Sequence, residues 1–351
     1  MKIFTIILGI RFSVLMRLIF RNGISLYPIY LARFMMLLMN SLISSVLILA
    51  EKKNYGKKIR ETSITLAPVF IIGHWRTGST LLHQLFCLDP QFTAPTMVQT
   101  TIPDHFLFST RYYLPILEKA MPKTRPMDNV PLSPLLGQED EFALIRMGSE
   151  SPLEKLIFPS GDAYFLNGYE HYIPSGKKLE TWKKNLLTFY KKITLQEGKQ
   201  IVSKNPYHTM RMELLAEMFP GAKFIHITRD PLIVVPSPIR MWDIVAEQNK
   251  LKRGWKSPSV SKTASVLRSY QDHVALCSQK LDNPIVEVRF EELELDTVGV
   301  LKRIYSDLDI PWSDSFEVAV NEFLWVNKGF EKNTYKLTKE EEKTIQSILQ
   351  F

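Results

Sequence analysis

The chain has 351 residues, 45% of them apolar, which is enough to bury the core of one large α/β domain with an appendage. Its two cysteines are too few for a disulfide framework or a metal cluster, and they favour a reducing compartment. The net charge of +8 comes from residues 1–60, which hold ten Lys or Arg and one acidic residue. The remainder holds 34 Lys or Arg and 35 Asp or Glu, which excludes a nucleic-acid-binding face on the main domain.

Residues 1–60 alternate apolar stretches with single arginines. The longest uncharged run, 34–50, has 17 residues and contains Asn and Ser, so it is at the lower limit of the roughly 17–25 residues that a membrane-spanning helix needs. The recurring charges argue against a secretory signal. We expect basic, apolar helices that lie in the interface of an anionic membrane. A helical hairpin packed on the main domain and a true membrane span are the alternatives.

This pattern divides the chain into a basic, apolar helical segment, 1–60, and a domain, 61–351. We expect the protein on the cytoplasmic face of a membrane, as a peripheral or monotopic protein.

A phosphate-binding loop is predicted directly after residues 69–72, which form a short buried strand. A loop between the carboxyl end of a strand and the amino end of a helix directs backbone N–H groups and the positive end of the helix dipole to one point. Gly73 and Gly78 allow the backbone to close around an anion. Further donors are the hydroxyl groups of Thr77, Ser79 and Thr80.

The spacing of this loop is close to that of a Walker A loop, but the Walker lysine is missing. Ser79 occupies its position, and the cation of the loop is Arg76. Because the lysine binds the β- and γ-phosphates, ATP or GTP hydrolysis is disfavoured, whereas a donor with a diphosphate-like head would fit. A glycine turn in an ordinary βα unit is the alternative interpretation.

The segment 90–159 holds ten of the 21 prolines. We therefore expect short helices and loops there, with no long regular element, as the cover of an acceptor site. Within it, Glu139 and Glu141 belong to an acidic cluster that runs into an apolar helical turn. The cluster either complements the dipole of that helix or supplies a carboxylate base.

Strands and helices alternate through the rest of the chain. Apolar residues at helical spacing predict a helix over 180–196 that ends near Gly198. The remaining predicted elements are strands at 200–203, 223–228 and 284–290 and a helix at 208–219. This alternation predicts a doubly wound, mostly parallel sheet with flanking helices, and places a ligand across the carboxyl ends of the strands.

Cations follow three of the predicted strands: Arg76 in the loop, Lys204 after the second strand and Arg229 after the third, with Ser237 eight residues later. An arginine at a strand end and a hydroxyl on the next helix can converge on an anion, which arginine binds through two hydrogen bonds. In this order along the chain, these groups resemble the PAPS-dependent sulfotransferase family, in the version with an arginine in the 5′-phosphosulfate loop that bacterial and tyrosylprotein enzymes carry.

The resemblance covers about residues 60–340 and implies the P-loop-like sulfotransferase fold. It implies transfer of a sulfuryl group from PAPS to an acceptor hydroxyl, which leaves PAP and needs no metal. Arg76 would hold the 5′-phosphosulfate, Lys204 would stabilise the transferring oxygens, and Arg229 with Ser237 would hold the 3′-phosphate. The donor-binding residues that it implies are Gly73, Arg76, Thr77, Gly78, Ser79, Thr80, Arg229, Ser237 and Lys328.

The sequence departs from the family pattern at two places. Lys328 and the residues up to 333 are similar to the segment that closes over the 3′-phosphate, but Asn327 replaces its arginine. The histidine base of the cytosolic enzymes is replaced by Pro206. We expect the base at Glu139 or Glu141, with the alternatives Asp104 and His105.

The acceptor is expected to be a hydrophobic hydroxylated molecule, a membrane lipid or a quinone-like compound. The basic, apolar N-terminal segment suggests this, and the resemblance to bacterial lipid sulfotransferases implies it. Two other classes share the predicted fold: a nucleotide or small-molecule kinase of the P-loop type, and a catalytically inactive membrane-bound scaffold. The missing Walker lysine argues against the first, and the retained cations argue against the second.

Overall fold

The computed structural model describes residues 5–125, 130–159, 173–329 and 335–350. The chain forms two compact units. Unit 1 comprises Met1–Ile64, Pro95–Gly198 and Arg240–Pro258, and unit 2 comprises Thr65–Ala94, Lys199–Ile239 and Ser259–Phe351.

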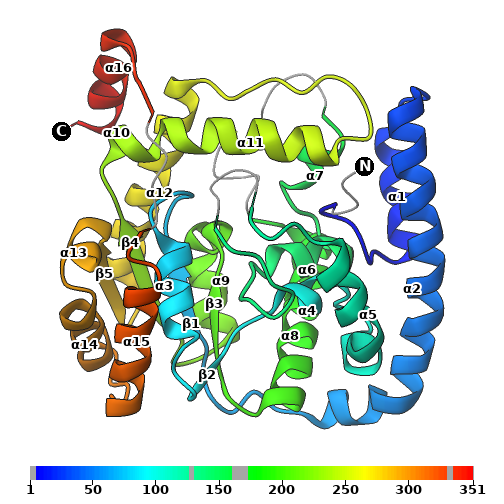
Figure 1. Ribbon diagram of the computed structural model, residues 1–351, viewed down its shortest axis with the longest axis horizontal. Coiled ribbons are helices and arrows are strands. Elements are labelled where there is room, and N and C mark those ends of the chain that lie inside the picture. The colour runs from blue at the N-terminus through cyan, green and yellow to red at the C-terminus, as the bar shows by residue number, and fades with distance from the viewer. Residues whose placement is uncertain (1–4, 126–129, 160–172, 330–334, 351) are drawn as a thin grey trace. The chain divides into compact units, whose positions relative to one another are not determined.

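Unit 2 is built around a sheet of five parallel strands (Figure 1). The strands are β1 (Val69–Ile72), β2 (Phe92–Thr93), β3 (Gln200–Lys204), β4 (Lys223–Thr228) and β5 (Ile285–Arg289), in the order β2-β3-β1-β4-β5. All four residues of β1 are buried, as an unbroken apolar run in a central strand requires. Because all strands run the same way, their carboxyl ends lie along one edge of the sheet.

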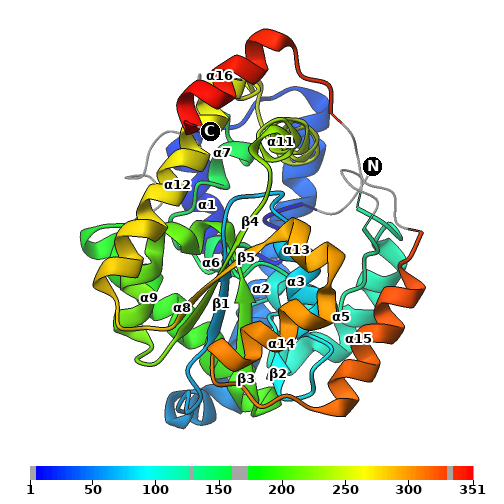
Figure 2. The ribbon, with the colours of Figure 1, turned by 90° about the vertical axis from the view of Figure 1, so that its left-hand side faces the viewer.

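Helices cover both faces of this sheet. Figure 2 shows α9 and α12 on one side of the strands, and α3, α13 and α14 on the other. The helical elements of unit 2 are α3 (Ser79–Phe86), η3 (Pro206–Arg211), α9 (Met212–Met218), α10 (Pro231–Val234), α12 (Val260–Lys280), α13 (Phe290–Leu295), α14 (Thr297–Asp307), α15 (Asp314–Val326) and α16 (Lys339–Leu349). Apolar residues of β1, β4 and β5 form one buried cluster with those of α3, α14 and α15. The predicted doubly wound parallel α/β fold is confirmed.

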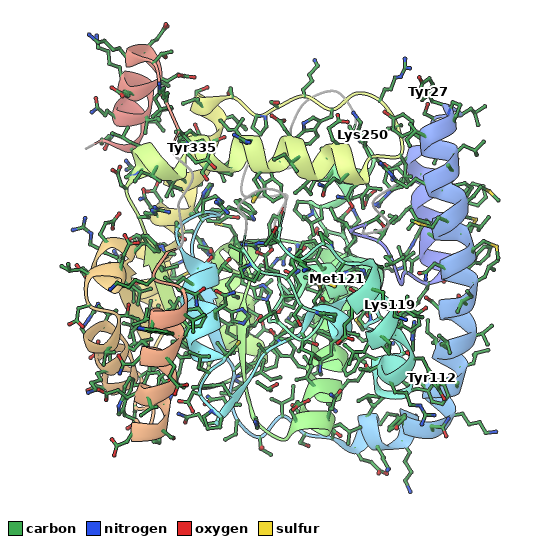
Figure 3. All side chains as sticks on the ribbon, viewed as in Figure 1. Tyr27, Tyr112, Lys119, Met121, Lys250 and Tyr335 are labelled. Atoms are coloured by element: carbon green, nitrogen blue, oxygen red, sulfur yellow. The ribbon has the colours of Figure 1, made fainter. Side chains whose placement is uncertain are left out.

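The described residues of unit 1 form helices without a sheet. They are α1 (Phe12–Asn22), α2 (Pro28–Glu61), α4 (Met97–Thr101), α5 (Phe106–Ala120), α6 (Glu141–Arg146), α7 (Glu154–Ile157), α8 (Gly176–Glu197) and most of α11 (Pro236–Asn249). The helix α2 packs against α1, α5 and α8. Figure 3 marks the start of α2 at Tyr27 and the neighbouring helix α5 at Tyr112. The predicted N-terminal helical segment is therefore present as a helical pair packed within unit 1.

A buried arginine fastens the chain before α1 to the rest of unit 1. Arg146 donates hydrogen bonds to the carbonyl oxygens of Leu8 at 2.7 Å, Thr100 at 2.8 Å and Phe142 at 2.8 Å. Burial lowers the pKa of Arg146 to about 9, which still leaves the group charged at neutral pH. Three backbone oxygens thus solvate a guanidinium that is out of contact with water.

An ion pair holds α2 to α8. The ammonium group of Lys192 lies 2.5 Å from a carboxylate oxygen of Glu51, and both side chains are 3% exposed. Lys192 also donates to the carbonyl oxygen of Pro103 and lies 4.4 Å from the centre of the Phe106 ring. The second carboxylate oxygen of Glu51 accepts from the backbone N–H of Phe108 at 3.2 Å. Both charges are paired and hydrogen-bonded, which buried charges require.

Two predictions about secondary structure are wrong. The proline-rich segment contains α5, a 15-residue helix with Pro115 inside it. The prolines of 90–159 are unevenly spaced, and Pro115 is the only proline within Phe106–Ala120, which leaves room for a helix. The predicted helix at 208–219 is also different: a 3₁₀ helix comes first, with Pro206 at its start, and α9 follows.

Removing one partner of the buried ion pair should destabilise unit 1. We expect Glu51→Gln to lower the free energy of unfolding by roughly 3–5 kcal/mol, since it leaves the Lys192 ammonium group buried and unpaired. The double variant with Lys192→Met should regain much of this loss, and urea denaturation measures both. A loss in Glu51→Gln no larger than in the exposed control Glu61→Gln would contradict the prediction.

Candidate active site

The loop between β1 and α3 has the strained backbone of an anion-binding turn. Gly73 has a φ of 134° and Gly78 a φ of 94°. A Cβ atom on Gly73 would overlap Ile227, and one on Gly78 would overlap Phe290. Arg76 adopts a φ of 72°. A left-handed conformation is costly for a residue with a side chain and is concentrated at functional sites.

Hydrogen bonds fix this loop from both sides. Gly73 donates its N–H to the hydroxyl oxygen of Thr209 at 2.8 Å, and the Thr209 hydroxyl donates to the carbonyl oxygen of Gly73 at 3.2 Å. The hydroxyl of Thr77 donates to the carbonyl oxygen of His74 at 2.9 Å. Ser79 is buried and Thr80 half-buried at the start of α3. Thr209 was not predicted, because a single threonine in a helical segment gives no sequence signal.

Arg76, Arg229 and Ser237 come together in the structure. The Nε of Arg76 donates to the hydroxyl oxygen of Ser237 at 2.9 Å, and an Nη1 of Arg229 donates to the carbonyl oxygen of Arg76 at 3.4 Å. Lys204 ends β3, where it pairs in register with Ile71 of β1, and it is buried. The carboxyl ends of three neighbouring strands therefore supply the three cations.

Arg229 lies among charges of both signs and has one buried donor atom without an acceptor in the described residues. Its guanidinium lies 4.3 Å from the centre of the Phe290 ring. Burial lowers its pKa; Glu294 and Glu291 raise it, and the nearby Arg76 lowers it further. Its Nε is buried without a hydrogen-bond partner in the described part of the chain. A buried donor of a charged group without an acceptor is costly, and an anion at this place would satisfy it.

Aromatic side chains of the loop pack against two tyrosines of neighbouring helices, a contact that was not predicted. The rings of His74 and Trp75 contact that of Tyr270, with centroids 5.6 and 5.8 Å apart, and Trp75 meets Tyr207 edge-on at 4.9 Å. Burial lowers the pKa of His74 to about 4, so this imidazole is neutral at neutral pH. These contacts pack the loop against η3 and α12.

The acidic cluster lies in unit 1. Glu141 is the first residue of α6 and is fully buried, Glu139 is half-buried, and both have interactions with other residues. Asp140 between them accepts a hydrogen bond from the hydroxyl of Tyr190 at 2.6 Å. Asp140 therefore joins this turn to α8.

The alternative bases, Asp104 and His105, are both engaged in packing. Asp104 forms an ion pair with Arg11. His105 is fully buried, its Nδ1 lies 2.6 Å from the hydroxyl oxygen of Ser109, and burial lowers its pKa to about 4. Lys328 is exposed after the end of α15, and the residues of its segment from 330 to 333 lie outside the described residues.

The arrangement of sheet, loop and helices is that of the sulfotransferase fold. Sulfotransferase STF9 from Mycobacterium avium matches 97% of this chain and 95% of its own with a TM-score of 0.68 at 16% identity. Sulfotransferase STF1 from Mycobacterium tuberculosis matches 96% of this chain and 90% of its own with a TM-score of 0.63 at 18% identity.

The chain belongs to the sulfotransferase family, whose model matches residues 68–314. It is 33% identical over 343 residues, 95% of this chain and 86% of the relative, to the omega-hydroxy-beta-dihydromenaquinone-9 sulfotransferase Stf3 of Mycobacterium bovis and of Mycobacterium tuberculosis. The protein is a sulfotransferase, which confirms the resemblance seen in the sequence and decides against a kinase.

The loop should not tolerate a side chain at Gly78. Gly78→Ala forces alanine into the left-handed region, which costs roughly 1–2 kcal/mol, and overlap with Phe290 should add roughly 1–3 kcal/mol. Gly198→Ala is the matched control, since Gly198 has a φ of 65° and nothing within 4 Å of a Cβ atom. Thermal melts compare the two variants, and equal losses would show that Phe290 does not restrict the loop.

Proposed function

We propose that the protein transfers a sulfuryl group from PAPS to the hydroxyl of a hydrophobic acceptor. The observation that supports this donor is that hydrogen bonds link Arg76, Arg229 and Ser237 at a strained loop. These groups offer cations and hydroxyl donors, and the buried Nε of Arg229 needs an acceptor. A donor with phosphate groups at both its 5′ and 3′ positions supplies acceptors for all of them.

Each group has a distinct task in this proposal. Arg76 and the loop N–H groups bind the 5′-phosphosulfate, together with the hydroxyls of Thr77, Ser79 and Thr80. Lys204 neutralises charge on the transferring group and the leaving phosphate, as cations do in phosphoryl transfer. Arg229 and Ser237 bind the 3′-phosphate and thereby select PAPS over nucleotides that lack it. We assign Lys328 to the same phosphate, and no metal to this site.

The base in this proposal is Glu139 or Glu141. The alternatives are Asp104, which forms an ion pair with Arg11, and His105, whose Nδ1 lies 2.6 Å from the hydroxyl oxygen of Ser109. A carboxylate that takes the hydroxyl proton of the acceptor raises its nucleophilicity as the sulfuryl group arrives.

We expect PAP, the product of transfer from PAPS, to bind far more tightly than ADP. Arg229→Ala should reduce this preference by about 30-fold, since a hydrogen bond to a charged group contributes roughly 1.5–3 kcal/mol. The control is Arg289→Ala, which removes an exposed arginine from the end of β5. Titration calorimetry measures the affinities of the wild type and of both variants for PAP and for ADP. Equal wild-type affinities for PAP and ADP would overturn the choice of donor.

A second prediction separates catalysis from packing in the acidic cluster. The amide variant of the true base, Glu139→Gln or Glu141→Gln, should lower turnover by roughly 10²–10⁴-fold while PAP affinity is kept. Asp140→Asn should instead lower the melting temperature, because it weakens the bond with Tyr190. Steady-state kinetics and melts distinguish the cases, and near wild-type rates in both glutamine variants would exclude the two glutamates.

We infer a lipid-like acceptor, with its hydroxyl on a hydrophobic quinone-type molecule. The name of the Stf3 relatives gives their acceptor as a hydroxylated dihydromenaquinone. The helix α2 adds support from this chain, since by length and composition it could cross a membrane. A lipid acceptor requires an enzyme that reaches the bilayer.

We propose that 1–60 attaches the domain 61–351 to the cytoplasmic face of an anionic membrane, with α2 lying in the plane of the bilayer. Exposed apolar residues on one face of α2 form a stripe: Leu31, Met35, Met39, Leu42, Val46 and Leu49. The opposite face is buried within the protein and includes Tyr30, Leu37, Ser41, Ser44 and Glu51. A helix with one apolar face exposed and the other face packed on the protein suits the interface better than a span.

Charges placed in this stripe should release the protein from vesicles. We expect the triple variant Met39→Glu, Leu42→Glu, Val46→Glu to reduce partitioning onto anionic vesicles by more than about tenfold, since burying one such side chain contributes roughly 1.5–3 kcal/mol. The control carries the same charge change at exposed apolar positions of unit 2: Leu295→Glu, Val318→Glu and Val326→Glu. Co-sedimentation measures both, and equal effects would refute attachment through α2.

A further inference from the structure

A second cluster of reactive side chains lies in unit 2, on the helices α9 and α12. His273 and Cys277 are one turn apart on α12, and Glu213 projects from α9. The candidate ligand atoms of the three residues all lie within 4.8 Å of one another. His273 and Cys277 are buried, whereas the side chain of Glu213 is 43% exposed.

The distance between the sulfur and the imidazole nitrogen fits a metal site. The sulfur of Cys277 lies 3.4 Å from the Nε2 of His273. Zinc binds thiolate at about 2.3 Å and imidazole at about 2.0–2.1 Å in tetrahedral geometry, which puts two such ligand atoms about 3.5 Å apart. A thiolate, an imidazole and a carboxylate are ligands that zinc accepts together, and two negative charges would neutralise the ion.

We propose that Glu213, His273 and Cys277 bind one divalent ion of the zinc type, with water in the fourth position. The ion joins α9 to α12. Tyr270, one turn before His273 on α12, contacts the rings of His74 and Trp75 in the loop. The site is thus a structural brace for the helix behind the loop, outside the reaction itself.

Binding has a defined proton balance. Burial raises the pKa of Cys277 to about 11, so the thiol holds its proton at neutral pH and must release one to the buffer when the ion binds. Burial lowers the pKa of His273, which keeps the imidazole neutral and ready to bind. Lys280 forms an ion pair with Glu213 at 3.6 Å and must give up this partner to the metal.

Cobalt tests the site because a cobalt–thiolate bond has a charge-transfer absorption that a carboxylate or imidazole cannot give. The full-length protein is stripped with a chelator and titrated with Co²⁺ while absorbance and proton release are recorded. We expect one equivalent to bind, with a thiolate band and about one proton released. Wild-type protein without this band overturns the proposal.

Variants assign the ligands. Cys277→Ser should abolish the thiolate band, and Glu213→Gln or His273→Ala should weaken Co²⁺ binding by more than tenfold, as losing a direct ligand costs more than losing its supporting partner. Cys87→Ser is the matched control, because Cys87 is the other free cysteine and is exposed. Circular dichroism checks that each variant folds. A band that persists in Cys277→Ser, or that disappears in Cys87→Ser, overturns the assignment.

Zinc should also stabilise the protein, by an amount that rises with the logarithm of the zinc concentration once this exceeds the dissociation constant. We expect added Zn²⁺ to raise the melting temperature of the stripped wild-type protein and of Cys87→Ser, but not that of Cys277→Ser. Equal shifts in Cys277→Ser and wild type would show that zinc binds elsewhere and would overturn the proposal.

Discussion

The burial of the Arg229 guanidinium is the constraint on which the proposed donor site depends. Burial lowers the pKa of Arg229, Glu294 and Glu291 raise it, and the nearby Arg76 lowers it, so keeping this group charged costs free energy. The parallel sheet brings these cations to one edge, and the hydrogen bonds to Ser237 and to the Arg76 carbonyl oxygen hold them there. A multiply charged anion between them would convert this cost into binding energy.

Contacts from the rest of unit 2 hold the loop in its strained conformation. The loop must keep Arg76 at a φ of 72°, which an isolated chain would rarely adopt. Thr209 binds both backbone groups of Gly73, and the aromatic residues behind the loop prevent it from relaxing. Preorganised donors need no rearrangement when charge develops during a reaction, and this makes electrostatic stabilisation effective.

The sequence predicted those parts of the fold and site that depend on neighbouring residues. Val69–Ile72 is recognisable as a strand because four apolar residues stand between Pro68 and Gly73, and the turn that follows has a known spacing. Thr209 and Phe290 were missed because their contacts with the loop depend on which strands pair. α5 was missed because the composition of a long segment conceals a local stretch with a single proline.

The N-terminal segment illustrates the same limit for charge. From the sequence, all ten cations of residues 1–60 were counted as available to a membrane. In the structure Arg11 pairs with Asp104, Arg21 pairs with Glu154, and Arg33 donates to the carbonyl oxygen of Lys250. The exposed lysines near the end of α2 remain: Lys52, Lys53, Lys57 and Lys58. Attachment through α2 would then owe more to its apolar stripe than to charge, and high salt would weaken it only in part.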